Sequence, residues 1–112
     1  NKKALQSKPE LLFAYFEYGV AEHFVATESQ DADRFRRAQL ILSTMGRNLD
    51  PNSRNWWHAK YFEVANLAAS GSYTDACFLM NDIDRTTSGF GKEFGLDDAF
   101  SQLKAQLKDK CK

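Results

Sequence analysis

Breaks in a helical hydrophobic pattern are the feature of this sequence that most constrains its fold. Apolar residues recur at three- and four-residue steps through most of the chain, and no segment shows the two-residue alternation of a strand over a convincing length. The pattern is interrupted at 27–31, at 48–53, at Gly71 and in the glycine-rich stretch 86–95. These interruptions predict an all-α chain of about five helices with no sheet.

Helix start and stop signals set the expected boundaries. Pro9 suits the first turn of a helix, and glycine commonly follows the last turn, so Gly46 is expected to stop the second helix and Gly71 the third. Short polar breaks between helices predict that neighbours fold back as antiparallel pairs. We therefore expect one domain, with a first hairpin at about 9–46, a second at about 53–86 and a closing helix at about 97–110.

The third predicted helix has apolar residues on two neighbouring stripes. Trp57, Tyr61 and Val64 lie on one stripe, and His58 and Phe62 lie beside it. A wide apolar arc is expected of a helix that other helices contact on both sides. This helix is therefore predicted to be buried through a wide arc.

Composition and charge exclude several classes of function. The chain has 15 basic and 15 acidic residues, and this balance lacks the basic surplus that nucleic acids or anionic membranes attract. No apolar run approaches the roughly 20 residues that a membrane helix needs, so no membrane insertion is expected. The chain starts with Asn1 rather than Met, without a signal peptide, and we take it for a soluble piece of a larger protein whose location stays unknown.

An internal repeat gives the strongest hint of a family. The triplet Tyr-Phe-Glu occurs at 15–17 and again at 61–63, each time in the first helix of a predicted hairpin. In the second hairpin an aromatic-rich helix is followed by Gly71, Tyr73 and Ala76 in the order Gly-x-Tyr-x-x-Ala. Over about 53–88 the chain resembles a tetratricopeptide repeat (TPR), and in particular the terminal repeats of some bacterial multi-repeat TPR proteins.

The resemblance implies an α-α superhelix in which the leading helix of each hairpin lines a concave surface. By position, this surface would contain residues of both leading helices: Leu12, Tyr15, Gly19 and His23, and His58, Tyr61 and Ala65. Tyr15, His23, His58 and Tyr61 would form the peptide groove. The partner would be a protein or a peptide. The usual Leu-Gly pair of the first helix is absent, and the first hairpin matches only by its architecture.

Catalytic and metal chemistry find little support in the sequence. His23 and His58 have no metal-ligand spacing with each other or with cysteine, and neither has a nearby nucleophile, so structural or surface roles are expected. The paired aspartates fall at predicted helix ends or on polar faces, where capping and solvation explain them. We predict no catalytic residue, no cofactor and no enzyme activity.

Two further groups leave alternatives open. Arg34 and Arg37 share a helix face and could form an anion-binding face, but Asp31 and Asp33 offset them, and a solvated face is the competing interpretation. The chain has two cysteines, Cys77 in a helical pattern and Cys111 in the lysine-rich tail. We expect both to be free thiols, one buried and one exposed, rather than a disulfide between the helix and the tail.

The sequence thus favours a non-catalytic interaction or scaffold module. A purely structural role, with self-association or packing inside the parent chain, is the alternative. A ligand-binding or enzymatic helical domain is the third and weakest hypothesis.

Overall fold

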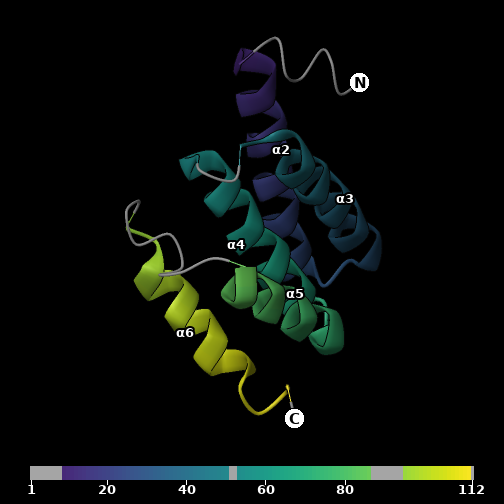
Figure 1. Cartoon of the computed structure of the whole chain (residues 1–112). Coiled ribbons are helices and arrows are strands. Elements are labelled where there is room, and N and C mark those ends of the chain that lie inside the picture. Colours follow the sequence, from purple (N-terminus) through teal and green to yellow (C-terminus); the bar gives the residue numbers. More distant parts are fainter. Residues whose placement is uncertain (1–8, 51–52, 87–94, 112) are drawn as a thin grey trace.

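A computed structural model describes the backbone of residues 9–50, 53–86 and 95–111, and the side chains of 13–50, 53–83 and 95–111. Within these residues the regular secondary structure is entirely α-helical, which confirms the all-α prediction with five helices. The helices are α2 (Pro9–Ser29), α3 (Ala32–Asn48), α4 (Arg54–Ala69), α5 (Tyr73–Thr86) and α6 (Asp97–Leu107) (Figure 1).

α4 is the central helix of the structure. It contacts α2 and α3 on one side and α5 and α6 on the other (Figure 1). The buried side chains of α4 accordingly point in two directions, with Ala59 and Asn66 toward the first pair and Trp57 and Val64 toward the second. α4 is thus contacted on both sides as expected, but the second packing face contains Ala59 and Asn66 rather than the predicted stripe of His58 and Phe62.

α2 and α3 approach closely because a glycine lies between them. A Cβ placed on Gly19 would lie 2.7 Å from Cγ2 of Ile41 on α3. The turn between the two helices places Gln30 in the left-handed region, at φ 54°. The side chain of Asp31 then caps α3 by accepting from the backbone N–H groups of Asp33 and Arg34.

The expected stop at Gly46 is wrong. α3 continues through this residue to Asn48, and Gly46 is buried. Its missing side chain leaves room for the next helix, because a Cβ there would lie 3.0 Å from Oε2 of Glu63 and 3.1 Å from Cε of Lys60. Gly46 thus serves a close helix contact rather than a helix end.

Gly71 does end α4. It adopts φ 85°, a conformation open to glycine at little cost. Its N–H bonds to the carbonyl of Ala68 at 3.1 Å, and the N–H of Ser72 bonds to the carbonyl of Leu67 at 2.9 Å. This pair of bonds is the Schellman motif, which satisfies carbonyls at a helix end and turns the chain into α5.

The carboxy-terminal helices enclose an aromatic core with α4. Phe100 of α6 is fully buried and meets both Trp57 and Tyr61 edge-on, with ring centroids 5.6 and 5.5 Å apart. Trp56 is half-buried, meets the ring of Trp57 edge-on with centroids 5.0 Å apart, and lies under the ammonium group of Lys60. The two adjacent tryptophans therefore face different surroundings, as their positions on a helix require.

The expectation of two free thiols is wrong, because Cys77 and Cys111 form a disulfide with their Cα atoms 5.6 Å apart. α6 ends at Leu107, before the expected end near residue 110. The N–H groups of Lys110 and Cys111 both bond to the carbonyl of Leu107, at 2.9 and 3.0 Å. This turn directs the chain back toward α5 and brings Cys111 to its partner.

Candidate protein-binding face

One stripe of α4 remains partly open between α2 and α6. His58, Phe62, Ala65 and Ala69 follow one another at four-, three- and four-residue steps and so lie on one side of the helix. All four are half-buried, whereas the buried residues of α4 lie on either side of them: Trp57 and Val64 on one side, and Ala59, Glu63 and Asn66 on the other. The open stripe is therefore only partly covered by the described residues of the neighbouring helices.

Aromatic rings from α2 border this stripe on one side. The ring of Phe62 lies 6.3 Å from that of Phe16 and 5.9 Å from that of Phe24, and Phe16 also lies 6.3 Å from the ring of His58. Phe24 keeps 56% of its surface exposed despite this contact. We refer to these four residues, Phe16, Phe24, His58 and Phe62, as the aromatic face.

A shallow hollow borders the stripe on the other side. It has a volume of about 330 Å³ and lies where α4 meets α5 and α6. Tyr61, Ala65 and Ala69 of α4 form one wall, and Leu103 and Lys110 belong to the opposite side. Because their side chains are small, Ala65 and Ala69 leave the hollow open toward the aromatic face.

The sequence-predicted groove residues separate in the structure. His58 and Tyr61 belong to this surface, His58 in the aromatic face and Tyr61 in the wall of the hollow. Tyr15 is half-buried and lies one helical turn before Gly19, on the side of α2 that approaches α3. The side chain of Leu12 lies outside the described residues.

His23 is placed in the core rather than in a groove. Only 6% of its surface is exposed, and its Nδ1 lies 2.9 Å from Oδ1 of Asn66 on α4. The amide nitrogen of Asn66 donates to the carbonyl of Phe35 at 2.9 Å and to the side chain of Gln39 at 3.0 Å. Asn66 must therefore accept through its oxygen, and Nδ1 of His23 must carry the donated proton.

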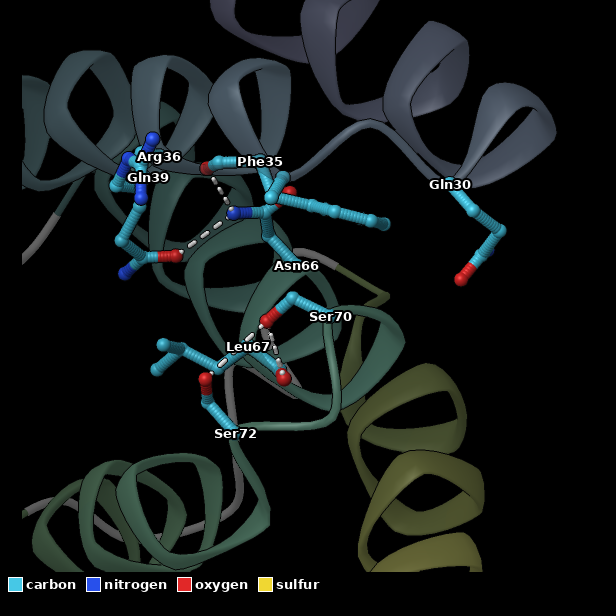
Figure 2. Close-up of a pocket in the computed structure, with 9 residues that line it drawn as sticks. Gln30, Phe35, Arg36, Gln39, Asn66, Leu67, Ser70 and Ser72 are labelled. Carbon is cyan, nitrogen blue, oxygen red and sulfur yellow. Dashed lines mark hydrogen bonds between the residues drawn. The ribbon is translucent and has the colours of Figure 1, made fainter.

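A polar hollow of about 300 Å³ opens beside Asn66, where the start of α3 meets the end of α4 (Figure 2). Its polar groups already have partners within the protein. The amide of Asn66 is bonded as described, the hydroxyl of Ser70 donates to the carbonyl of Leu67 at 2.9 Å, and Arg36 pairs with Asp33. The hollow therefore offers no unpaired buried group for a ligand.

Arg34 and Arg37 converge on one carboxylate. Each guanidinium group donates to Glu22 of α2, Arg34 at 2.9 Å and Arg37 at 3.0 Å. Glu22 is buried, and its hydrogen bond and charge raise the pKa of Arg37 above its usual value. The proposed anion face is thus largely occupied by a carboxylate of the protein itself.

Two other titratable groups have shifted pKa values. Burial, followed by the nearby charge of Arg54, lowers the pKa of His58, so the imidazole in the aromatic face favours its neutral form. Burial raises the pKa of Glu63, and the charge of Lys60, 3.2 Å away, opposes that rise. Oε2 of Glu63 is within ion-pair distance of Lys60 but accepts no hydrogen bond of good geometry.

Searches for other kinds of site among the described residues give no candidate. No group of three or more histidine, cysteine or carboxylate side chains there could hold a metal ion. None of the described helices is both long and apolar enough to cross a membrane.

Sequence reasoning placed His58 on the surface but missed Phe16, Phe24, Phe62 and Ala69. The repeated triplet drew attention to its tyrosines, but the phenylalanine that follows each tyrosine is the ring that faces the other leading helix. A rotation of about 100° separates adjacent helical residues, so a one-residue error exchanges core and surface. The spacing of Phe16, Val20 and Phe24 was the available signal, because it is a second apolar stripe on α2.

Comparisons with known proteins supply no identity: no protein-family model, no curated protein and no solved structure matches this chain.

Proposed function

We propose that this chain is a non-catalytic interaction module that binds a protein or peptide segment across the open stripe of α4. The observation that supports this most directly is the aromatic face, where Phe24 stays 56% exposed although it is packed against Phe62. Exposed aromatic rings with restricted rotamers are favoured in binding surfaces, because they bury large areas with little loss of conformational freedom.

The shape of the surface supports an elongated partner. The open stripe runs along α4 from His58 to Ala69, roughly 16 Å at 1.5 Å per residue, and it passes from the aromatic face into the hollow beside α6. A partner residue with an apolar side chain would bury it against Ala65 and Ala69. The partly buried His58, with its lowered pKa, would contribute a neutral imidazole to the same contact.

The test is an affinity capture with two baits, the wild-type chain and a variant carrying Phe24→Ala with Ala69→Gln. The first change removes an exposed ring and the second fills the hollow, so both should leave the fold intact. A matched control is Leu40→Ala on α3, which removes another exposed apolar side chain, 62% exposed, away from the stripe.

A protein that the wild-type chain and the Leu40→Ala control retain, and that the double variant loses, supports the proposal. Its contact residues should then be mapped by amide chemical-shift changes on titration of the purified partner. Equal capture by all three chains, or shifts confined to residues away from α4, would contradict the assignment.

A further inference from the structure

The disulfide joins a buried cysteine to an exposed one. Cys77 of α5 keeps only 7% of its surface exposed and belongs to the apolar core that contains Trp57 and Phe100. Cys111 is exposed, in the turn that follows α6. A thiol in solution can therefore reach Sγ of Cys111, whereas the protein shields Sγ of Cys77 from attack.

The turn that carries Cys111, residues 108–111, has its own hydrogen bonds within the end of α6. The N–H groups of Lys110 and Cys111 donate to the carbonyl of Leu107. Toward α5, the ammonium group of Lys110 lies 4.9 Å from the ring centroid of Tyr73, which is a weak contact at an exposed site. The disulfide supplies the covalent attachment of this turn to α5.

α6 itself is held by apolar burial and not only by the disulfide. Phe100, Leu103 and Leu107 keep between 0% and 5% of their surface exposed, and all three belong to the core shared with α4 and α5. Opening of the disulfide should therefore release the turn while α6 stays packed, as expected for a local opening rather than global unfolding.

The same turn borders two hollows. Lys110 and Leu107 line the hollow of the proposed binding face. Leu107, Lys108 and Cys111 line a second hollow of about 460 Å³ between α5 and α6, which also contains Met80. Figure 1 shows the chain turning back toward α5 after α6. A movement of this turn therefore changes the wall of the hollow in which a partner would bind.

We propose that Sγ of Cys111 is a thiol-exchange site, at which a dithiol reductant opens the disulfide and thereby regulates the binding face. In the first step a thiolate of the reductant forms a bond to Sγ of Cys111, and Cys77 leaves as a thiolate that takes up a proton. In the second step the other thiol of the reductant displaces Cys111, which leaves as a thiolate and is protonated. Two electrons pass from the dithiol to the protein, which ends with two thiols, and the reductant ends as a disulfide.

The oxidised chain holds the turn against the hollow, and the reduced chain also samples arrangements in which the turn is released. A partner that contacts this wall binds only the fraction of molecules in which the wall is in place. Reduction should weaken binding by roughly three- to tenfold if that fraction lies between about a third and a tenth. This effect on binding rests on the proposed function, whereas the exchange site and the release of the turn do not.

The exchange site is tested with reduced glutathione as a monothiol probe. The oxidised full chain is mixed with an excess of the probe, quenched with acid at early times, digested and analysed by mass spectrometry. The glutathione adduct should be found on Cys111, with Cys77 as the free thiol. Equal adducts on both cysteines, or no exchange in the folded chain, would overturn the assignment.

Release of the turn is tested by nuclear magnetic resonance before and after addition of dithiothreitol. Backbone order parameters of residues 108–111 should fall from about 0.85 to below about 0.6, while those of α4 stay high. The variant with Cys77→Ser and Cys111→Ser is the control, which should match the reduced chain and show no response to dithiothreitol. An unchanged turn, or unfolding of the whole chain in circular dichroism, would contradict a local switch.

The effect on binding is tested with the partner obtained by affinity capture. Its affinity should be three- to tenfold lower for the reduced chain and for the double serine variant than for the oxidised chain, and reoxidation of the wild type should restore it. Equal affinity in both redox states overturns the regulation. A chain that captures no partner in either state contradicts the proposed function instead, because the first two measurements need no partner.

Discussion

The two sides of α4 are held together by different interactions. Toward α2 and α3, buried polar side chains link the helices: Asn66 bonds to His23 of α2 and to the backbone of α3, and Glu22 holds two arginines. Toward α5 and α6, the contacts are a core of apolar and aromatic side chains around Phe100, closed by a disulfide. The amino-terminal side therefore depends on directional bonds, and the carboxy-terminal side on apolar burial and one covalent bond.

This difference predicts separate sensitivities. Hydrogen bonds between buried groups stabilise one arrangement, because an unpaired partner is costly, whereas apolar packing tolerates small shifts. α6 makes few contacts with α4 and α5, and the disulfide limits how far α6 can move away from α5. Reductant should therefore act on the α5–α6 side, and loss of a single polar side chain should act on the α2–α3 side.

Removal of the disulfide should have the largest effect. Replacing both Cys77 and Cys111 by serine opens a loop whose ends are 34 residues apart. The loss of this constraint on the unfolded chain should cost about 3–4 kcal/mol. Urea unfolding of the oxidised wild-type chain and of the variant measures it, with the reduced wild-type chain as a control that should match the variant. A variant as stable as the oxidised protein would contradict the importance of the crosslink.

Loss of the Asn66 amide should have the next largest effect. Asn66→Leu keeps a similar volume but leaves the Nδ1–H of His23 without an acceptor in the core and removes the donor to the carbonyl of Phe35. Buried unpaired groups should cost about 2–3 kcal/mol in the free energy of unfolding. Asn55→Leu, at an exposed position of the same helix, is the control and should change stability little. Equal stability of the two variants would show that the polar link is dispensable.

A side chain at Gly19 should have a moderate effect. Gly19→Ala places a Cβ 2.7 Å from Cγ2 of Ile41, and the resulting shift of α2 against α3 should cost more than the gain in helix propensity returns. The net loss should be about 1 kcal/mol. The same substitution in an Ile41→Ala background, where the clashing methyl group is gone, should be neutral or stabilising. A loss of equal size in both backgrounds would point to a cause other than this contact.

The buried carboxyl group of Glu63 should have the smallest effect, visible as a dependence on pH. Its pKa is raised in the folded chain, so the folded state binds the proton more tightly than the unfolded state does. The contribution to stability is therefore present in full below the pKa of the unfolded chain and is lost as the pH rises through the raised value. Glu63→Gln should flatten this part of the stability profile in a pH series of urea titrations. An unchanged slope would assign it to other groups.

The architecture could be predicted from the sequence because it rests on local signals. Pro9, Gly71 and the polar breaks act through backbone geometry within a few residues, and periodicity showed that α4 is covered on two sides. The helix end predicted at Gly46 was wrong because a glycine gives the same sequence signal at a helix end and at a close contact between helices. Only the position of Lys60 and Glu63 on the next helix decides between the two.

The surface was harder to predict because it depends on the rotation of each helix. His23 has the same spacing as a groove residue, but α4 places an amide against it and buries it. Arg34 and Arg37 share a face as expected, yet the carboxylate that they bind comes from the preceding helix. The disulfide joins residues distant in sequence, and its formation depends on the turn after Leu107, for which the sequence carries no local signal.

The central position of α4 limits where this chain can be divided. A hairpin can often be exchanged as a unit, but here α4, the first helix of the second hairpin, also packs against both helices of the first hairpin. A fragment that ends after α3 would expose Phe35 and Gly46 to water, and one that begins at α4 would leave the amide of Asn66 without its partners. The smallest fragment that keeps the polar links must extend from α2 through Ala69. The repeated sequence pattern therefore does not mark independent modules.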